Sequence, residues 1–350
     1  MKIAVLVSGG VDSSVALSLL KKQGHDLTAF YLKIWLEDEL SFLGTCPWQE
    51  DLKYVKAVCR KLRVPLKVIS LQKEYWKNVV SYTLREIKAG RTPNPDMMCN
   101  QVIKFGLFYK KINKEFDKVA TGHYAQVKEN KGIFYLSRSP DPVKDQTYFL
   151  ADLSQKQLAR ALFPIGKYTK SEVRKLAYKF DLPNKDRKDS QGICFLGQIK
   201  FKEFVKHHLG EKRGDVVEYE TGKKVGNHDG CWFFTIGQRR GLALGHGPWY
   251  VVKKNIRKNI VYVSNRFEKL EKERSLFFVG NFNWIIGKPK IKILHVKIRH
   301  GPKLYKCTIK FRKNQKIADV KIKGRDQGLA PGQFAVFYDG KVCLGGGVIQ

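Results

Sequence analysis

Residues 1–14 have the sequence MKIAVLVSGGVDSS, and this stretch decides the fold of the N-terminal half of the chain. Residues 3–8 form a short apolar run that ends at two glycines, as a buried strand does. Residues 13–22 follow with apolar side chains on one helical stripe. A strand, a glycine turn and a helix in this order favour the α/β class.

The turn itself, SGGVDSS at 8–14, has the chemistry of an anion site. Glycines let the backbone approach an anion closely, the first-turn amides of a helix point at it, and the Ser8 and Ser13 hydroxyls add donors. Asp12 would repel a phosphate, unless a magnesium ion bridges the two. The alternative is a tight turn in which Asp12 caps the helix. The whole motif favours phosphate binding, although GxxxxGK[ST] is missing and the turn is not a Walker A loop.

The alternation continues outward from this turn. Strands are expected at 27–34, 66–70 and 118–121, and helices at 50–62, 73–89 and 100–113. This pattern predicts a parallel sheet covered by helices on both faces. A hairpin at 124–137 and two helices follow, the second opening with a capping box formed by Thr169 and Glu172.

Beyond about residue 210 the pattern changes to short β-rich runs between Gly, Asn and Asp turns. The last of these runs predict a barrel of the size seen in nucleic-acid-binding folds. We therefore predict three domains: an α/β domain at 1–198, a small central β-rich domain at 199–268 and a C-terminal β-barrel at 269–350.

The composition points to a polyanionic partner. Lys and Arg number 66 against 32 Asp and Glu, which gives a formal net charge of +34 among 350 residues. Such a surplus favours nucleic acid, although a genome rich in Lys codons would also produce it. No run of 18 apolar residues and no signal peptide are present, so we expect no membrane contact and a cytoplasmic protein, with an organelle stroma or matrix as the alternative.

Seven cysteines are spread widely without any CxxC pair, which argues against a disulfide scaffold and a zinc ribbon. Cys99 ends the stiff segment RTPNPDMMC at 91–99, directly before a helical pattern. A helix N-terminus and Lys104 would lower the pKa of its thiol. Asp96 would raise that pKa, so its useful role is proton transfer. The alternative is that Asp96 caps the helix and Cys99 belongs to the core.

The second segment, DSQGICFL at 189–196, places Cys194 after a polar, glycine-containing turn. Such a position favours an accessible thiol.

Taken in order, SGGVDSS, PNPDMMCN, ATGHYA at 120–125, KDQTYFL at 144–150, DSQGICF and CLGGGVI at 343–349 resemble the tRNA-specific 2-thiouridylase family. That family belongs to the PP-loop ATP pyrophosphatases, and the resemblance covers essentially the whole chain. The chain departs from many bacterial members at 36–47, which is longer and more apolar.

The resemblance implies an ATP- and Mg²⁺-dependent enzyme with a PP-loop catalytic domain and a central tRNA-binding domain. ATP would adenylate the C2 oxygen of the wobble uridine, and sulfur from a Cys194 persulfide would then replace that oxygen. Cys99 would be the second catalytic cysteine, left in a disulfide with Cys194, and Asp96 the general acid/base. The products would be 2-thiouridine, AMP and pyrophosphate.

The family also implies binding residues and partners. Residues matching the ATP site are Leu6, Val7, Ser8, Gly9, Gly10, Val11, Asp12, Ser13, Leu32 and Gly122. Residues matching tRNA contacts are Asn94, Pro95, Asp96, His123, Lys144, Asp145, Gln146, Arg299, His300 and Gln333. We expect no resident metal centre, a monomer, a protein that donates persulfide sulfur, and as substrates the anticodon stem-loops of tRNAs for Lys, Glu and Gln.

Three alternatives stay open at this level. A PP-loop synthetase that adenylates a small molecule would need no second cysteine. A non-enzymatic RNA-binding protein would not need the intact loop. An iron–sulfur cluster held by Cys99, Cys194 and a third ligand would replace the persulfide chemistry.

Overall fold

The computed structural model describes residues 1–34, 48–112, 114–189, 201–245, 247–266, 275–290, 293–313, 316–326 and 328–350. The unusual segment 36–47, Cys194 and both expected domain boundaries lie outside the described residues. Among the described residues, no helix is long and apolar enough to cross a membrane.

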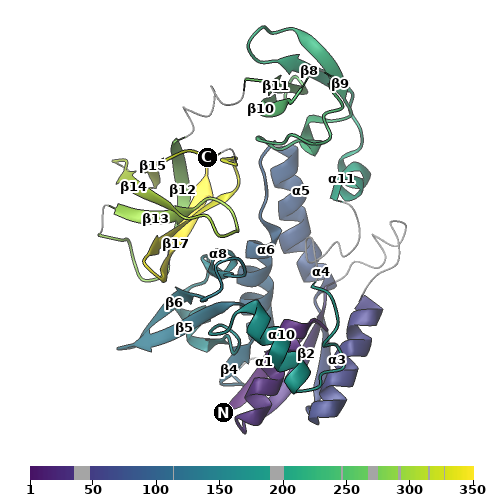
Figure 1. Cartoon of the computed structure of the whole chain (residues 1–350), viewed down its shortest axis with the longest axis vertical. Helices are drawn as coiled ribbons and strands as arrows, with labels where there is room; N and C mark the ends of the chain where they lie inside the picture. The colour runs from purple at the N-terminus through teal and green to yellow at the C-terminus, as the bar shows by residue number, and fades with distance from the viewer. Residues whose placement is uncertain are drawn as a thin grey trace.

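The N-terminal half is built on a five-stranded sheet in the order β3-β2-β1-β4-β7 (Figure 1). Every pairing in it is parallel, which confirms the predicted sheet. The strands are β1 (Lys2–Leu6), β2 (Asp26–Lys33), β3 (Leu66–Ser70), β4 (Lys118–Ala120) and β7 (Ala161–Leu162).

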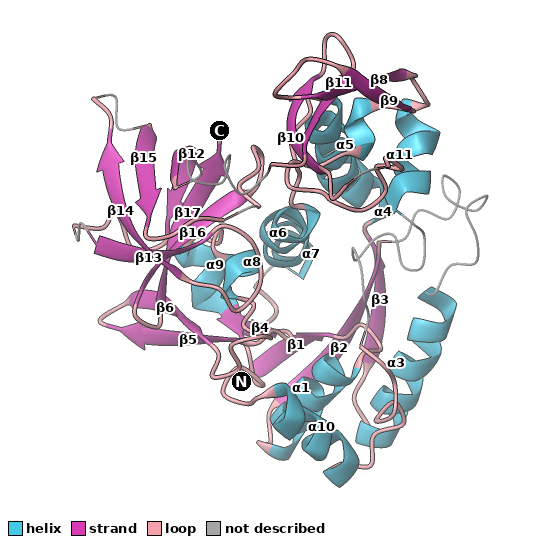
Figure 2. Cartoon of the chain, turned by 45° about the horizontal axis from the view of Figure 1, so that its top comes forward, coloured by secondary structure: helices cyan, strands magenta, loops and turns pink. Residues whose placement is uncertain are grey.

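Helices cover both faces of this sheet, because β1 alternates its side chains between two cores. Ile3 and Val5 belong to one core, and Ala4 and Leu6 to the other. The first core is closed by α1 (Val11–Lys22), α3 (Trp48–Leu62) and α10 (Lys170–Lys179) (Figure 2). The second is closed by α4 (Gln72–Tyr75), η2 (Trp76–Val80), α5 (Ser81–Lys88), α6 (Pro95–Met98), η3 (Cys99–Leu107) and α7 (Phe108–Ile112).

The helix that carries Cys99 begins earlier than predicted, at Pro95 instead of residue 100. Asn94 caps it, since its Oδ1 accepts a 3.2 Å hydrogen bond from the Met97 amide, and proline suits the first helical position. From Cys99 to Leu107 the helix widens to the π form, which is common at functional sites. Gly106 makes room for the wide turn, because a Cβ there would lie 2.8 Å from the Gln101 carbonyl oxygen.

A small sheet in the order β10-β11-β8-β9 forms a second body. Its members are β8 (Gly214–Glu218), β9 (Lys224–His228), β10 (Tyr250–Asn255) and β11 (Ile260–Ser264), with α11 (Phe201–Leu209) before it and η4 (Cys231–Phe233) within it. Its core contains Val216, Cys231, Val251 and Val261. This sheet and the C-terminal barrel lie apart, on either side of α6 (Figures 1 and 2).

The C-terminal residues form a six-stranded antiparallel barrel, closed by the pairing of β12 with β17. Its strands are β12 (Leu276–Trp284), β13 (Ile293–Lys297), β14 (Tyr305–Phe311), β15 (Ile317–Ile322), β16 (Phe334–Asp339) and β17 (Val342–Ile349). The predicted barrel is therefore confirmed.

The barrel is joined to the N-terminal half by backbone pairing. The predicted hairpin forms as β5 (Ala125–Asn130) and β6 (Ile133–Arg138), and β6 pairs with β17 in the register Leu136 to Cys343. The helices α8 (Thr147–Leu150) and α9 (Gln155–Arg160) follow this hairpin along the chain.

A buried ion cluster strengthens the same junction. The Lys297 Nζ on β13 lies 2.8 Å from the Asp145 Oδ2, and both side chains are fully buried. Arg138 and Thr147 also donate to the Asp145 carboxylate, at 3.0 and 2.8 Å. Burial alone would raise the pKa of Asp145, but Lys297 and these donors outweigh it and hold the pKa below its usual value.

We predict that Lys297→Met destabilises the barrel by about 3–5 kcal/mol, because it leaves a buried carboxylate with less compensation. Urea denaturation measures the loss. Lys303→Met is the matched control, since the Lys303 Nζ lies 4.0 Å from Asp326 and its side chain is 62% exposed, so the change should be within about 1 kcal/mol. Equal losses for the two variants would contradict the role of the buried cluster.

Candidate active site

The predicted phosphate turn lies at the carboxyl end of β1, the central strand of the sheet. The turn is held by its own polar groups: Ser13 Oγ donates to the Gly10 carbonyl at 3.0 Å and accepts from the Ser8 amide at 3.2 Å. Gly10 is the N-cap of α1 and brings no side-chain cap, so within the described part of the chain the first-turn amides have no capping side chain. Uncapped amides at a helix start form an anion site. The alternative in which Asp12 caps the helix is wrong.

Two neighbouring strands complete the edge of this site. A Cβ at Gly122, just after β4, would lie 2.7 Å from the Ser13 amide nitrogen, so only glycine allows this approach. Leu32, near the end of β2, is half-buried on the other side of β1. The structure therefore brings Gly122 and Leu32 to the same sheet edge as the turn, where α/β sheets bind ligands.

Asp12 is hydrogen-bonded to two side chains that were not predicted as site residues. Its Oδ1 accepts hydrogen bonds from the Tyr124 hydroxyl at 2.9 Å and from the Lys170 Nζ at 2.7 Å. Lys170 also lies 2.7 Å from Asp189, which Lys144 contacts at 2.8 Å. Burial would raise the pKa of Asp189, but Lys144 and Lys170 hold it far below its usual value.

This ion-pair chain connects the phosphate turn to residue 189, the last described residue before the segment that contains Cys194. In the sequence, Lys170 appears only inside the capping box of α10, and that box gives no sign of a second role. The contact between Lys170 and Asp12 cannot be recognised from the sequence, because the two residues are far apart along the chain.

Further side chains hold the turn from outside. Asn184, which is 1% exposed, donates its Nδ2 to the Gly9 carbonyl at 2.7 Å and to Ser14 Oγ at 2.9 Å. Arg187 pairs with Asp51 at 2.6 Å and lies beside Gly9. These contacts place a guanidinium next to the anion site.

Cys99 is buried in the second turn of its helix and is 1% exposed. Burial is the main cause that raises the pKa of its thiol, and Asp96 raises it further, whereas Lys104 and a hydrogen bond from Tyr75 lower it. The predicted directions for Asp96 and Lys104 are confirmed. The predicted lowering by a helix N-terminus is wrong, because the helix starts at Pro95 and the dipole effect fades beyond the first turn.

Two buried oxygens next to Cys99 have no hydrogen-bond partner in the described part of the chain: Asp96 Oδ1 and Asn100 Oδ1. Asp96 was predicted as a proton-transfer group, whereas Asn100 was not singled out. Buried polar atoms are nearly always paired, so a cluster of exceptions indicates a place where a ligand completes the bonding.

The barrel brings two of the predicted tRNA-binding residues, Gln333 and His300, close to this region. The Gln333 Nε2 donates to the Pro93 carbonyl at 3.4 Å, which places Gln333 next to the start of α6. The His300 ring stacks on Phe149 with ring centres 4.7 Å apart. Loss of hydration lowers the pKa of His300, and the nearby carboxylate of Asp96 acts in the opposite direction.

The other expected tRNA contacts are more varied. Arg299 is 53% exposed while it pairs with Asp326 at 2.7 Å, and the Gln146 Oε1 accepts from the Tyr124 amide at 2.9 Å. His123 is buried, its Nδ1 is 2.7 Å from Thr121 Oγ1, and burial lowers its pKa well below the usual value. Asp145 is buried in the ion cluster at the barrel junction. The side chains of His123 and Asp145 are therefore buried and are not part of an open surface.

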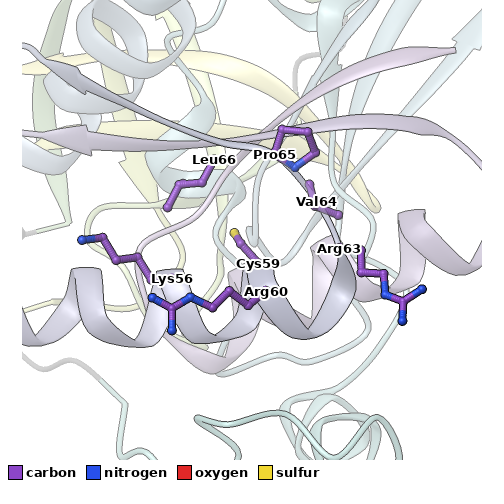
Figure 3. Close-up of a pocket in the computed structure, with 7 residues that line it drawn as sticks. All are labelled: Lys56, Cys59, Arg60, Arg63, Val64, Pro65 and Leu66. Carbon is purple, nitrogen blue, oxygen red and sulfur yellow. The ribbon is translucent and has the colours of Figure 1, made fainter.

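A hollow in the surface occurs elsewhere, between α3 and β3, and is lined by Lys56, Cys59, Arg60, Arg63, Val64, Pro65 and Leu66 (Figure 3). Figure 3 shows the Arg63 guanidinium pointing away from the charged ends of Lys56 and Arg60. Burial raises the pKa of Cys59 to about 11, so its thiol is protonated at neutral pH. The hollow does not include the phosphate turn or Cys99.

A parallel sheet with an uncapped helix start at its central strand defines an α/β nucleotide-binding domain. The family models agree: "tRNA methyl transferase HUP domain" matches 1–198, "tRNA methyl transferase PRC-barrel domain" 202–265 and "Aminomethyltransferase beta-barrel domain" 274–349.

Full-length relatives narrow the class. The tRNA-specific 2-thiouridylase MnmA of Parabacteroides distasonis is 46% identical over 356 residues, covering 100% of this chain and 99% of the relative. The tRNA-specific 2-thiouridylase MnmA 2 of Bacteroides fragilis is 46% identical over 358 residues and the whole of both chains. The chain belongs to the tRNA-specific 2-thiouridylase family.

One solved structure of a tRNA thiolase overlaps this chain only loosely. The U34-tRNA thiolase NcsA from Methanococcus maripaludis with its [4Fe-4S] cluster is 18% identical, with a TM-score of 0.37 over 59% of this chain and 64% of that one. An overlap of this size supports no inference about chemistry.

We predict that Cys99 in the free protein is alkylated by iodoacetamide more slowly at neutral pH than a free cysteine, because its raised pKa keeps the thiol protonated. Lys104→Met should slow the reaction further and Asp96→Asn should speed it. Peptide mass spectrometry as a function of pH measures the rates. Cys307, whose pKa burial raises to about 12, is the internal reference. Fast alkylation of Cys99 at pH 7, unaffected by either substitution, would contradict this account.

Proposed function

We propose that this protein is a tRNA-specific 2-thiouridylase: it adenylates the C2 oxygen of the wobble uridine with ATP and then replaces that oxygen by sulfur. One observation carries the proposal. An uncapped phosphate turn and a cysteine flanked by an unpartnered carboxylate oxygen occur on the two helical layers of one sheet, among the residues that the structure describes. Membership of the thiouridylase family, at 46% identity over the full length, supports the same reaction.

The activation half of the reaction uses the turn. The triphosphate would bind at the α1 start, with the adenine between Leu32 and Gly122, and the ATP-binding residues would be those that match the family's ATP site. The Arg187 guanidinium beside Gly9 adds positive charge. Attack by the uridine O2 on the α-phosphorus forms the adenylate and releases pyrophosphate, so a poor leaving group becomes a good one.

Magnesium fits this site as a bridge and not as a caged ion. No group of three His, Cys, Asp or Glu residues that could hold a metal occurs in the described ranges. Asp12 is the acidic residue of the turn, and its hydrogen bonds from Tyr124 and Lys170 both end on Oδ1. Asp12 would therefore hold Mg²⁺ together with phosphate oxygens, and the ion would neutralise charge on the phosphates.

The sulfur half uses the cysteines. The terminal sulfur of a Cys194 persulfide attacks C2, and AMP leaves. The Cys99 thiolate then attacks the Cys194 sulfur, which leaves 2-thiouridine and a Cys99–Cys194 disulfide for a thiol reductant to open. Asp96, close to Cys99 on the same helix, acts as the base that takes the proton of the Cys99 thiol. A persulfide-carrying donor protein would reload Cys194.

The tRNA would lie against the barrel and the Cys99 helix. Arg299, His300 and Gln333 come from the barrel side, and Lys144 and Gln146 from the loop before α8. A protein with a net charge of +34 attracts the anticodon stem-loop through its phosphates. We propose that the three domains at 1–198, 199–268 and 269–350 act together as a cytoplasmic monomer on tRNAs for Lys, Glu and Gln.

We predict that incubation with unmodified tRNA, ATP, Mg²⁺ and cysteine persulfide gives 2-thiouridine, AMP and pyrophosphate. Cys99→Ser should abolish 2-thiouridine, and Asp96→Asn should lower its rate by about 10²–10⁴-fold. Nucleoside mass spectrometry measures the product. Cys59→Ser, which removes a thiol remote from the site, should leave the yield unchanged.

Two results would favour the alternatives. Pyrophosphate release without tRNA would indicate a synthetase that adenylates a small molecule. Binding of tRNA with neither nucleotide turnover nor thiolated product would indicate an RNA-binding protein.

We also predict that Gly122→Ala weakens ATP binding by about 10- to 100-fold, because the new methyl group would sit 2.7 Å from the Ser13 amide and push the phosphate turn out of shape. Gly245→Ala is the matched control, since a Cβ at Gly245 meets nothing within 4 Å. Isothermal titration with ATP and Mg²⁺ measures both. Equal affinities for Gly122→Ala and the unchanged protein would remove the turn from the nucleotide site.

A further inference from the structure

The proposed reaction leaves one question of specificity open, and any answer to it rests on that proposed function. Uracil and cytosine both carry a C2 carbonyl, so activation of the C2 oxygen does not by itself choose between them. The two bases differ next to C2, at N3. Uracil has an N3–H donor there, whereas the cytosine N3 is an acceptor. A side chain that reads uracil at this atom must present a buried acceptor.

Asn100 presents such an acceptor beside Cys99. Its side-chain Nδ2 donates to the Phe149 carbonyl oxygen at 3.1 Å. A carbonyl oxygen can only accept, so this bond fixes the nitrogen toward Phe149 and leaves Oδ1 on the other side of the amide. Asn100 is 3% exposed, and Oδ1 has no hydrogen-bond partner among the described residues.

The surroundings of Asn100 match a base site. Asp96 and Asn100 lie four residues apart on one helix and therefore share a face, with Cys99 adjacent to Asn100 in the chain. Phe149, which fixes Asn100 through its carbonyl, also stacks its ring on His300. Aromatic rings of this kind commonly hold extruded bases.

We propose that Asn100 is the residue that selects uridine: its Oδ1 accepts the N3–H of the target base while the neighbouring C2 faces Cys99. Cytosine would bring a lone pair against that oxygen, so binding would leave both acceptors unpaired. The π-helical start at Cys99 and the Phe149 contact hold the amide in the orientation that makes this distinction.

The proposal makes a measurable claim about a ratio. Loss of a hydrogen bond that one base makes and the other cannot should change the ratio by about 10- to 100-fold, which is about 1.4–2.8 kcal/mol. Asn100→Leu keeps nearly the same shape without polar atoms, and Asn100→Ala removes the amide altogether. In both variants, the preference for uridine over cytidine should fall by about that factor.

The experiment uses the full chain and two tRNA transcripts that differ only by U or C at the first anticodon position. We would measure kcat/KM for thiolation of each, together with the dissociation constant of each in direct competition. Gln101→Leu is the matched control: Gln101 also donates its side-chain amide to a backbone carbonyl of the same segment, to Asp152 at 3.2 Å, but it is not proposed to contact the base.

The expected result is a lower U-to-C ratio in both Asn100 variants and an unchanged ratio for Gln101→Leu. Proportional losses on both transcripts, with the ratio intact, would overturn the proposal and leave Asn100 with a purely structural role. If the unchanged protein forms no 2-thiouridine at all, the proposed function fails; the competition constants would still decide whether Asn100 distinguishes the two bases.

Discussion

The structure depends on one constraint, the uncapped start of α1 at the end of the central strand. Gly10 provides no capping side chain, so among the described residues the first-turn amides of α1 are available to an anion. Residues from neighbouring elements contact the turn and Asp12. Gly122 comes close because it has no Cβ, Asn184 binds the Gly9 carbonyl of the turn, and Lys170 binds Asp12, whose carboxylate would repel a phosphate. The helical layer that contains Cys99 packs on the opposite face of the sheet from α1.

Cys99 shows how burial and reactivity are separated in this protein. A thiol that is 1% exposed and has a raised pKa is unreactive toward chance electrophiles and oxidants. Lys104 and Tyr75 act in the direction that favours the thiolate, and Asp96 acts against it. A change in the protonation or the bonding of Asp96 on arrival of a substrate would therefore shift this balance toward thiolate, at the moment when the thiol has a target.

Much of the fold follows from local patterns. The apolar runs with glycine stops predicted the strands of the parallel sheet, and turn spacing predicted the barrel. The start of the Cys99 helix was misplaced because the first four residues, Pro95–Met98, are too few to show a helical period, although the Asn94–Pro95 cap does mark the true start. The predicted direction of the Cys99 pKa shift was also wrong. Burial, which raises this pKa, depends on tertiary packing and cannot be read from neighbours in the sequence.

Some residues of the site were also predictable from the sequence, and others were not. Motifs indicated the phosphate turn, Cys99 and Asp96. Lys170, Asn184 and Arg187 escaped, because each is distant along the chain from the turn that it contacts and has an ordinary local role. Asn100 escaped because an amide next to a cysteine carries no signal until its donor and acceptor ends can be told apart. His123 and Asp145 were predicted to contact tRNA, and their side chains are buried. One-dimensional patterns do not distinguish a polar contact with RNA from a polar contact in the interior.

The pairing of β6 with β17 has a consequence for how the chain is made. Leu136 lies in β6, and its neighbour Cys343 lies in β17, which the ribosome produces after the small sheet and the other strands of the barrel. One edge of β6 therefore stays unpaired while the small sheet and the barrel are synthesised. An unpaired strand edge can associate with other chains. Lys128 and Lys131 in this hairpin give the nascent segment charge that opposes such association. The catalytic and barrel parts are joined by this backbone pairing only once β17 has been made.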